Sequence, residues 1–146
     1  MNKYRTHKCN ELNKAMVGKK VILSGWINKK RDHGNILFID LRDNYGISQC
    51  IIDKKNTNFS VLEKTQLETV LKIEGKVLER TKETINKDIP TGEIEVVIDK
   101  FEILGECKEL PMPIFSDQEY SEEIRLKYRF LDLRRKKIHE NIILRS

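Results

Sequence analysis

The sequence predicts an all-β domain with short helices, in which a five-stranded β-barrel is followed by a linker and a C-terminal helix. Apolar and polar residues alternate with a period of two in several separate stretches, as expected for half-buried strands. Turn residues and one segment of helical spacing separate these stretches. The 146 residues are enough for one compact domain with an appendage.

The first part of the chain contains three predicted strands in sequence order. The expected elements are a short helix over 9–16, a strand over 19–28 bent near Gly25, a polar loop over 29–35, a second strand over 36–42 with Leu37, Ile39 and Leu41 on its inner face, a turn over 43–46 and a third strand over 47–52. The turn residues between the second and third strands predict a hairpin.

The second part supplies two more strands and the appendage. The expected elements are a short helix over 58–67, strands over 69–80 and 93–104 separated by a polar loop, a linker over 110–121 containing two prolines, and a helix over 122–145, continuous or broken, with Ser121 as its N-cap. Three strands, a helix and two strands is the element order of the OB barrel, with an SH3-like barrel as the alternative. We therefore expect a barrel domain over 1–109.

Charge is distributed unevenly along the chain, whose net charge is +5. Residues 1–42 hold 10 Lys and Arg against 3 Asp and Glu, whereas residues 43–121 hold 10 against 16 and residues 122–146 hold 8 against 4. A basic first part predicts one positive face that meets a polyanion, although an ordinary lysine-rich surface gives the same count.

Several function classes lack support in the sequence. No apolar run approaches the length of a transmembrane helix and no signal peptide is recognisable, so we expect a soluble, cytoplasmic protein. The three cysteines lie far apart without metal-ligand spacing, which indicates reduced thiols and no metal site. The histidines have no nucleophile in a recognisable motif and no phosphate-binding glycine loop is present, so binding is the expected function rather than catalysis.

The candidate binding residues lie where an OB barrel binds single-stranded nucleic acid. Phe38 lies on the outer face of the second strand, where its ring either stacks on an unpaired base or is buried under a loop. Gln49 lies on the same face of the third strand, and its amide suits the edge of a base. Arg80 and Glu95 flank the long loop, and Glu95 can accept hydrogen bonds from a guanine-like edge. The candidates for phosphate contacts are Lys29, Lys30, Arg31 and Arg42.

Several short motifs stand out along the sequence: RTHKCNEL (5–12), GW followed by RDHG (25–34), FIDLRD (38–43), GISQ (46–49), TGEIEV (91–96) and EEIRLKYRFLDLRRKK (122–137). With these motifs the sequence resembles a known family, bacterial-type aspartyl-tRNA synthetase, in its N-terminal anticodon-binding region. The resemblance covers essentially the whole chain.

The resemblance implies a role for each candidate residue. Phe38 would stack on the central anticodon base, Gln49 would recognise that base, and Glu95 would help to recognise the first anticodon base. Arg31 and Arg80 would contact the anticodon stem-loop. His33 is similar to the residue of members that charge both tRNA(Asp) and tRNA(Asn). Ile51 departs from the aromatic residue of many relatives, which puts a second stacking position in doubt.

The resemblance further implies a longer parent protein. In that parent, a class II catalytic domain that uses ATP, Mg²⁺ and L-aspartate would follow Ser146, residues 122–146 would begin its first motif, and the parent would be a homodimer. This chain itself would hold no cofactor. Two other functions remain open: an OB module that binds single-stranded nucleic acid without sequence preference, and a protein-interaction barrel.

Overall fold

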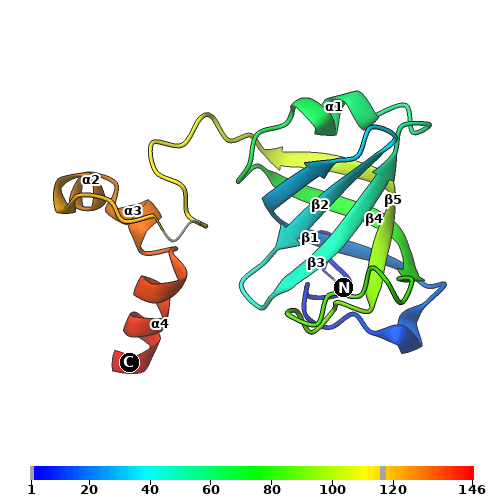
Figure 1. Ribbon diagram of the computed structural model, residues 1–146, viewed down its shortest axis with the longest axis horizontal. Coiled ribbons are helices and arrows are strands. Elements are labelled where there is room, and N and C mark those ends of the chain that lie inside the picture. The colour runs from blue at the N-terminus through cyan, green and yellow to red at the C-terminus, as the bar shows by residue number, and fades with distance from the viewer. Residues whose placement is uncertain (1, 116–117) are drawn as a thin grey trace. The chain divides into compact units, whose positions relative to one another are not determined.

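Five strands close into a barrel in a computed structural model, which describes residues 2–115 and 118–146 (Figure 1). The strands are β1 (Lys20–Asp32), β2 (Ile36–Arg42), β3 (Ile47–Asp53), β4 (Val70–Glu79) and β5 (Ile94–Gly105). Their order around the barrel is β1-β2-β3-β5-β4. All neighbouring strands are antiparallel except β3 and β5, which pair in parallel through Cys50–Val96 and Ile51–Val97. The predicted five-stranded OB fold is confirmed.

The interior of the barrel is filled by the inward-facing residues of every strand. Leu37, Ile39 and Leu41 are at most 2% exposed, as their alternation predicted. The helix α1 (Phe59–Lys64) is shorter than the predicted 58–67 and lies at one end of the barrel (Figure 1). Phe59 and Leu62 from this helix join the core of the barrel. The chain divides into two compact units between Cys107 and Lys108.

β1 continues four residues beyond its predicted end. Lys29, Lys30, Arg31 and Asp32 pair with residues 37–40 of β2, after an irregularity in register between Ile27 and Lys29. The sequence signal missed this extension because four consecutive charged residues show no apolar alternation. Backbone pairing with β2 nevertheless keeps these residues extended, and it places the side chain of Arg31 opposite Phe38.

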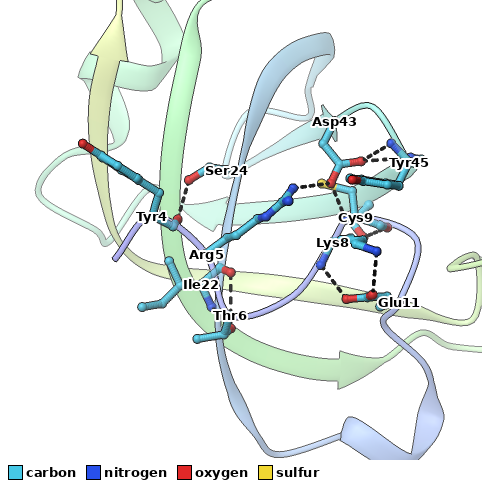
Figure 2. Close-up of polar contacts among 12 residues, drawn as sticks. Tyr4, Arg5, Thr6, Lys8, Cys9, Glu11, Ile22, Ser24, Asp43 and Tyr45 are labelled. Atoms are coloured by element: carbon cyan, nitrogen blue, oxygen red, sulfur yellow. Dashed lines mark hydrogen bonds and ion pairs between the residues drawn. The ribbon is translucent and has the colours of Figure 1, made fainter. Parts of the chain in front are cut away.

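The helix predicted over 9–16 is largely wrong, because only Lys14–Met16 forms a short 3₁₀ helix, η1. The preceding residues bond to the barrel instead (Figure 2). Thr6 donates from its amide to the carbonyl of Ile22, at 2.8 Å, and Cys9 donates from its amide to the Asp43 carboxylate, at 2.9 Å. The carbonyl of Cys9 accepts from the hydroxyl of Ser48 at 2.6 Å, whereas in a helix over 9–16 it would accept from the amide of Asn13.

The second unit contains three short helices, α2 (Glu122–Lys127), α3 (Arg129–Asp132) and α4 (Lys136–Arg145). The predicted helix over 122–145 is therefore broken, and Ser121 caps α2 by accepting from the amide of Ile124. Asp132 is fully buried and forms ion pairs with Arg125, Arg129 and Arg135. A small apolar cluster of Met112, Ile114 and Leu131 is buried beside these helices.

Candidate nucleic-acid interface

A pocket of about 530 Å³ opens on the surface of the barrel and gathers most of the candidate binding residues. Side chains from β1, β2 and β3 form one part of its wall, and the end of β4 with the β4–β5 loop forms another. The lining residues are Arg31, His33, Phe38, Gln49, Arg80 and residues 84–88. Five of the six predicted site residues are thus brought together, and the sixth, Glu95, is joined to them by a hydrogen bond from Gln49.

Phe38 lies at the wall of the pocket and is half-buried. The ring of His33 meets it edge-on, with the ring centroids 5.1 Å apart and an interplanar angle of 78°. The guanidinium carbon of Arg31 lies 5.8 Å from the ring centroid of Phe38. Phe38 is therefore held in place on two sides while part of its ring stays accessible, as a stacking surface for a base requires.

Gln49 is only 5% exposed, which is unusual for an outward-facing strand residue. Its Oε1 accepts a hydrogen bond from Nη2 of Arg31 at 2.9 Å, and its Nε2 donates to Oε2 of Glu95 at 3.1 Å. The same Nη2 of Arg31 also donates to Oδ1 of Asp40 at 3.0 Å. A hydrogen-bond network therefore runs across β1, β2, β3 and β5 and consists of Asp40, Arg31, Gln49 and Glu95.

Asp40 belongs to this hydrogen-bond network but was not among the candidate residues predicted from the sequence. It pairs with Gln49 across β2 and β3. The sequence signal that could have indicated Asp40 is its position on the same outer face as Phe38, two residues further along β2. A lone carboxylate among presumed phosphate-binding residues gives no functional signal until the pairing of the strands is known.

Arg80 is buried, at 6% exposed, although it carries a charge. Its Nε donates to the carbonyl oxygen of Ile94 at 2.8 Å, and its Nη1 donates to that of Thr84 at 3.3 Å. Burial lowers the pKa of the guanidinium, although nearby Glu95 acts in the opposite direction. Among the described residues, Nη2 of Arg80 has no hydrogen-bond partner. A buried donor of this kind favours an acceptor supplied by a ligand in the pocket.

The β4–β5 loop contributes residues 84–88 to the pocket wall, which the sequence analysis treated only as a polar connection. The loop is held at its base by two hydrogen bonds. The amide of Asn86 donates to the carbonyl of Gly92 at 3.1 Å, and the hydroxyl of Thr91 donates to the carbonyl of Ile47 at 2.6 Å. The first bond closes the loop on itself, and the second joins it to the start of β3.

Two of the basic residues predicted to contact phosphates have structural partners instead. Nζ of Lys30 donates to the carbonyl oxygens of Leu62, Glu63 and Thr65 at the end of α1. The guanidinium of Arg42 donates to both carboxylate oxygens of Glu68, at 3.1 and 3.0 Å, and to Asn28. These two predictions are corrected, because both cations are already engaged in holding the barrel together.

The closed five-stranded barrel, with a pocket between its β1–β3 face and its β4–β5 loop, has the architecture of an OB domain. The model of the tRNA anti-codon family, described as OB-fold nucleic acid binding domain, matches residues 21–104. The chain belongs to this family.

Individual relatives agree with the family assignment. The chain is 78% identical over all of its 146 residues to the Aspartate--tRNA(Asp/Asn) ligase of Pelagibacter ubique, of which it covers 25%. It is similar to asparaginyl-tRNA synthetase from Pyrococcus horikoshii, with a TM-score of 0.74 and 30% identity over 88% of this chain and 28% of that one. The aspartyl tRNA synthetase from Entamoeba histolytica has a TM-score of 0.79 at 21% identity, over 90% of this chain and 33% of that one, and shows the shared fold.

These comparisons confirm the resemblance to aspartyl-tRNA synthetases that the sequence motifs indicated. The chain spans about a quarter of the length of the curated relatives that it matches. In the described parts of the chain, no helix is long and apolar enough to span a membrane. No cluster of three or more potential metal ligands occurs among the residues that the structure describes.

Proposed function

We propose that the chain is the anticodon-binding part of an aspartate–tRNA ligase and that its pocket receives the anticodon loop of tRNA(Asp). The observation that carries this proposal is the pocket itself, which combines the half-buried ring of Phe38, the amide of Gln49 and the buried Nη2 of Arg80, which has no hydrogen-bond partner among the described residues. Unstacked bases in RNA loops are recognised by such combinations of stacking and hydrogen bonding.

Within this proposal, each residue has a specific role. Phe38 stacks on the central anticodon base, and Gln49 recognises its edge. Glu95 helps to recognise the first base, for which its position beside Gln49 is suitable. Arg31 and Arg80 supply donors to the stem-loop, and the exposed Lys29 adds positive charge near the rim. Contacts to phosphates position the RNA, whereas contacts to base edges specify its sequence.

The exposed histidine in the β1–β2 connection extends the proposal to a second tRNA. His33 lies at the pocket and packs edge-on against Phe38, so it is placed to influence how an anticodon loop enters. We propose that the parent charges tRNA(Asn) as well as tRNA(Asp). The Pelagibacter ubique relative carries both tRNAs in its name, which supports this extension.

The parent enzyme is proposed to be a cytoplasmic, homodimeric class II ligase that uses ATP, Mg²⁺ and L-aspartate. ATP and Mg²⁺ would be held by the catalytic part of the parent, since this chain covers 25% of the Pelagibacter ubique relative. In this arrangement residues 1–109 form the RNA-binding domain, 110–121 the linker and 122–146 the start of the catalytic domain. The exposed apolar residues Ile142, Ile143 and Leu144 suit a protein–protein interface within the proposed parent enzyme.

The proposal is tested by measuring the binding of the chain to RNA hairpins by fluorescence anisotropy at two salt concentrations. One hairpin carries the loop with the aspartate anticodon GUC, and a second carries a loop with an unrelated anticodon. Tighter binding to the GUC hairpin at both salt concentrations supports the proposal. Equal and salt-sensitive binding would indicate a module without sequence preference, and no binding would favour a protein-interaction barrel.

A further inference from the structure

We infer that Arg31 and Glu95 act as positioning residues that fix the orientation of the Gln49 amide, so that the pocket accepts one pyrimidine at the base contacted by Gln49 and rejects the other. This inference rests on the proposed function, under which the accepted base is the central uracil of the aspartate anticodon and the rejected base is cytosine. Neither residue needs to touch that base to have this effect.

The chemistry of the two neighbours determines which way the amide faces. A guanidinium has only donors and an ionised carboxylate has only acceptors. Gln49 therefore turns its oxygen to Arg31, at 2.9 Å, and its nitrogen to Glu95, at 3.1 Å. Turning the amide by half a rotation would set NH₂ against the guanidinium and oxygen against the carboxylate, which loses both hydrogen bonds and adds two repulsive contacts.

Burial makes this orientation strict. Gln49 is 5% exposed, so water has little access to replace a lost hydrogen bond, and an unsatisfied amide atom at such a position is unfavourable. Arg31 is itself held by Asp40, whose Oδ1 accepts from Nη2 at 3.0 Å. The pairing of Asp40 with Gln49 across β2 and β3 keeps the acceptor of Arg31 beside the amide.

The fixed amide retains one lone pair on Oε1 and one N–H on Nε2 for a ligand. Along the same edge, uracil presents an N3–H donor beside the O4 acceptor, whereas cytosine presents an N3 acceptor beside an N4 donor. A base whose ring stacks on Phe38 in one pose therefore matches the amide in one orientation, and the other pyrimidine matches only the reversed amide. An amide that can turn freely accepts both.

The test uses the whole 146-residue chain and two hairpins that differ only in a U or a C at the centre of the anticodon. The key variant is the double substitution Arg31→Met and Glu95→Gln, which leaves the net charge unchanged. In this variant the oxygen of Gln49 no longer faces a cation, and the amide at position 95 can serve as either donor or acceptor. Arg31→Lys, which keeps a donor, and Lys29→Met, which removes an exposed charge nearby, are the matched controls.

The wild-type chain is expected to prefer the U hairpin by roughly tenfold or more, as for other bidentate base contacts. The double variant is expected to bind both hairpins more weakly, because the Arg31 donor is lost, and to bring the two affinities within about threefold, because the amide can then face either pyrimidine. Arg31→Lys should keep most of the preference, and Lys29→Met should weaken both complexes equally. A purely structural role of the two residues would weaken both complexes by the same factor and would leave the preference for the U hairpin unchanged.

The two possible failures are distinguishable. If the wild-type chain does not distinguish the hairpins, the proposed function fails. If the wild type prefers the U hairpin and the double variant keeps the same preference while circular dichroism shows it folded, the function stands and the positioning role is overturned. If the double variant does not fold, Glu95→Gln alone is used instead. A reduced preference for the U hairpin then supports the inference, and an unchanged preference overturns it.

Discussion

Nε of Arg80 donates a hydrogen bond of 2.8 Å to the carbonyl oxygen of Ile94, so the first residue after β4 is joined to the first residue of β5 across the base of the β4–β5 loop. A second bond, from Nη1 to Thr84, ties the guanidinium to the loop itself, and Nη2 stays without a partner among the described residues. Arg80 thus has two roles: it holds the wall of the pocket in place, and it supplies a charged donor there.

Arg80→Met should therefore reduce RNA binding through both effects. Loss of a charged donor is expected to weaken the complex with every hairpin by about 1.5–3 kcal/mol. Amide hydrogen exchange in the loop, at Asn86 in particular, should become faster because the bond to Thr84 is lost. Binding is measured by anisotropy, and the exposed Lys82→Met serves as the control in the same loop. Affinity equal to that of wild type would show that Arg80 does not contact RNA.

Phe38→Ala should separate recognition from stability. The half-buried ring is expected to contribute about 1–3 kcal/mol of stacking to RNA binding, whereas its removal should lower the free energy of unfolding by less than that of a core residue. The comparison is Ile39→Ala on the inner face, which is fully buried and should cost about 2–5 kcal/mol of stability. Thermal denaturation and anisotropy are measured for both variants. A Phe38→Ala chain as unstable as Ile39→Ala would mean that the ring serves the core.

The inner faces of the barrel could be predicted because their signal is local. Alternation at Leu37, Ile39 and Leu41 follows directly from the period of a strand, and the outer face is then fixed by exclusion. Phe38 became a candidate in this way, as an aromatic residue on that outer face, and Gln49 as an amide on the same face. Chain order and the turn signals then gave the arrangement of the strands.

The remaining parts of the site depend on pairings that are distant in the sequence. Gln49 and Glu95 are 46 residues apart and are joined only because β3 and β5 are neighbours in the barrel. Cys9 and Asp43 are 34 residues apart, and their hydrogen bond lies in a segment where a helix over 9–16 was expected but only Lys14–Met16 is helical. Periodicity within a window of a few residues carries no information on such contacts, so the roles of Asp40 and of the loop residues 84–88 emerged only from the structure.

Gly75→Ala should destabilise the barrel strongly. A Cβ atom at this position would lie 2.2 Å from the carbonyl oxygen of Val97 on the neighbouring strand β5, and backbone on a central pairing of β4 and β5 cannot move aside easily. We expect a loss of at least about 2 kcal/mol in the free energy of unfolding, measured by urea denaturation. Gly105→Ala is the matched control, since its Cβ would meet nothing closer than 3.9 Å. Similar midpoints for the two variants would contradict the close approach of the strands.

The buried thiols should make the domain less stable in alkaline solution. Burial raises the pKa of Cys9 above its ordinary value of 9.0, with the nearby Asp43 carboxylate as a further cause, and burial also raises that of Cys50. Above pH 9.0 the unfolded chain releases protons that the folded chain retains, so the unfolded state is favoured as the pH rises. The stability contributed by each thiol is complete below that pH and declines by about 1.4 kcal/mol per pH unit above it.

Cys9→Ala tests this linkage because it removes one of the two thiols. Denaturation in urea is measured for wild type and variant from pH 7 to 11, and the difference between their free energies of unfolding is plotted against pH. Titration of the lysines and tyrosines affects both proteins alike, so it cancels in this difference. The variant should lose stability less steeply than wild type above pH 9.0, where the thiol of Cys9 alone distinguishes them. Parallel curves would mean that the unfolded and folded chains hold this proton equally, and hence that the N-terminal segment leaves the barrel readily.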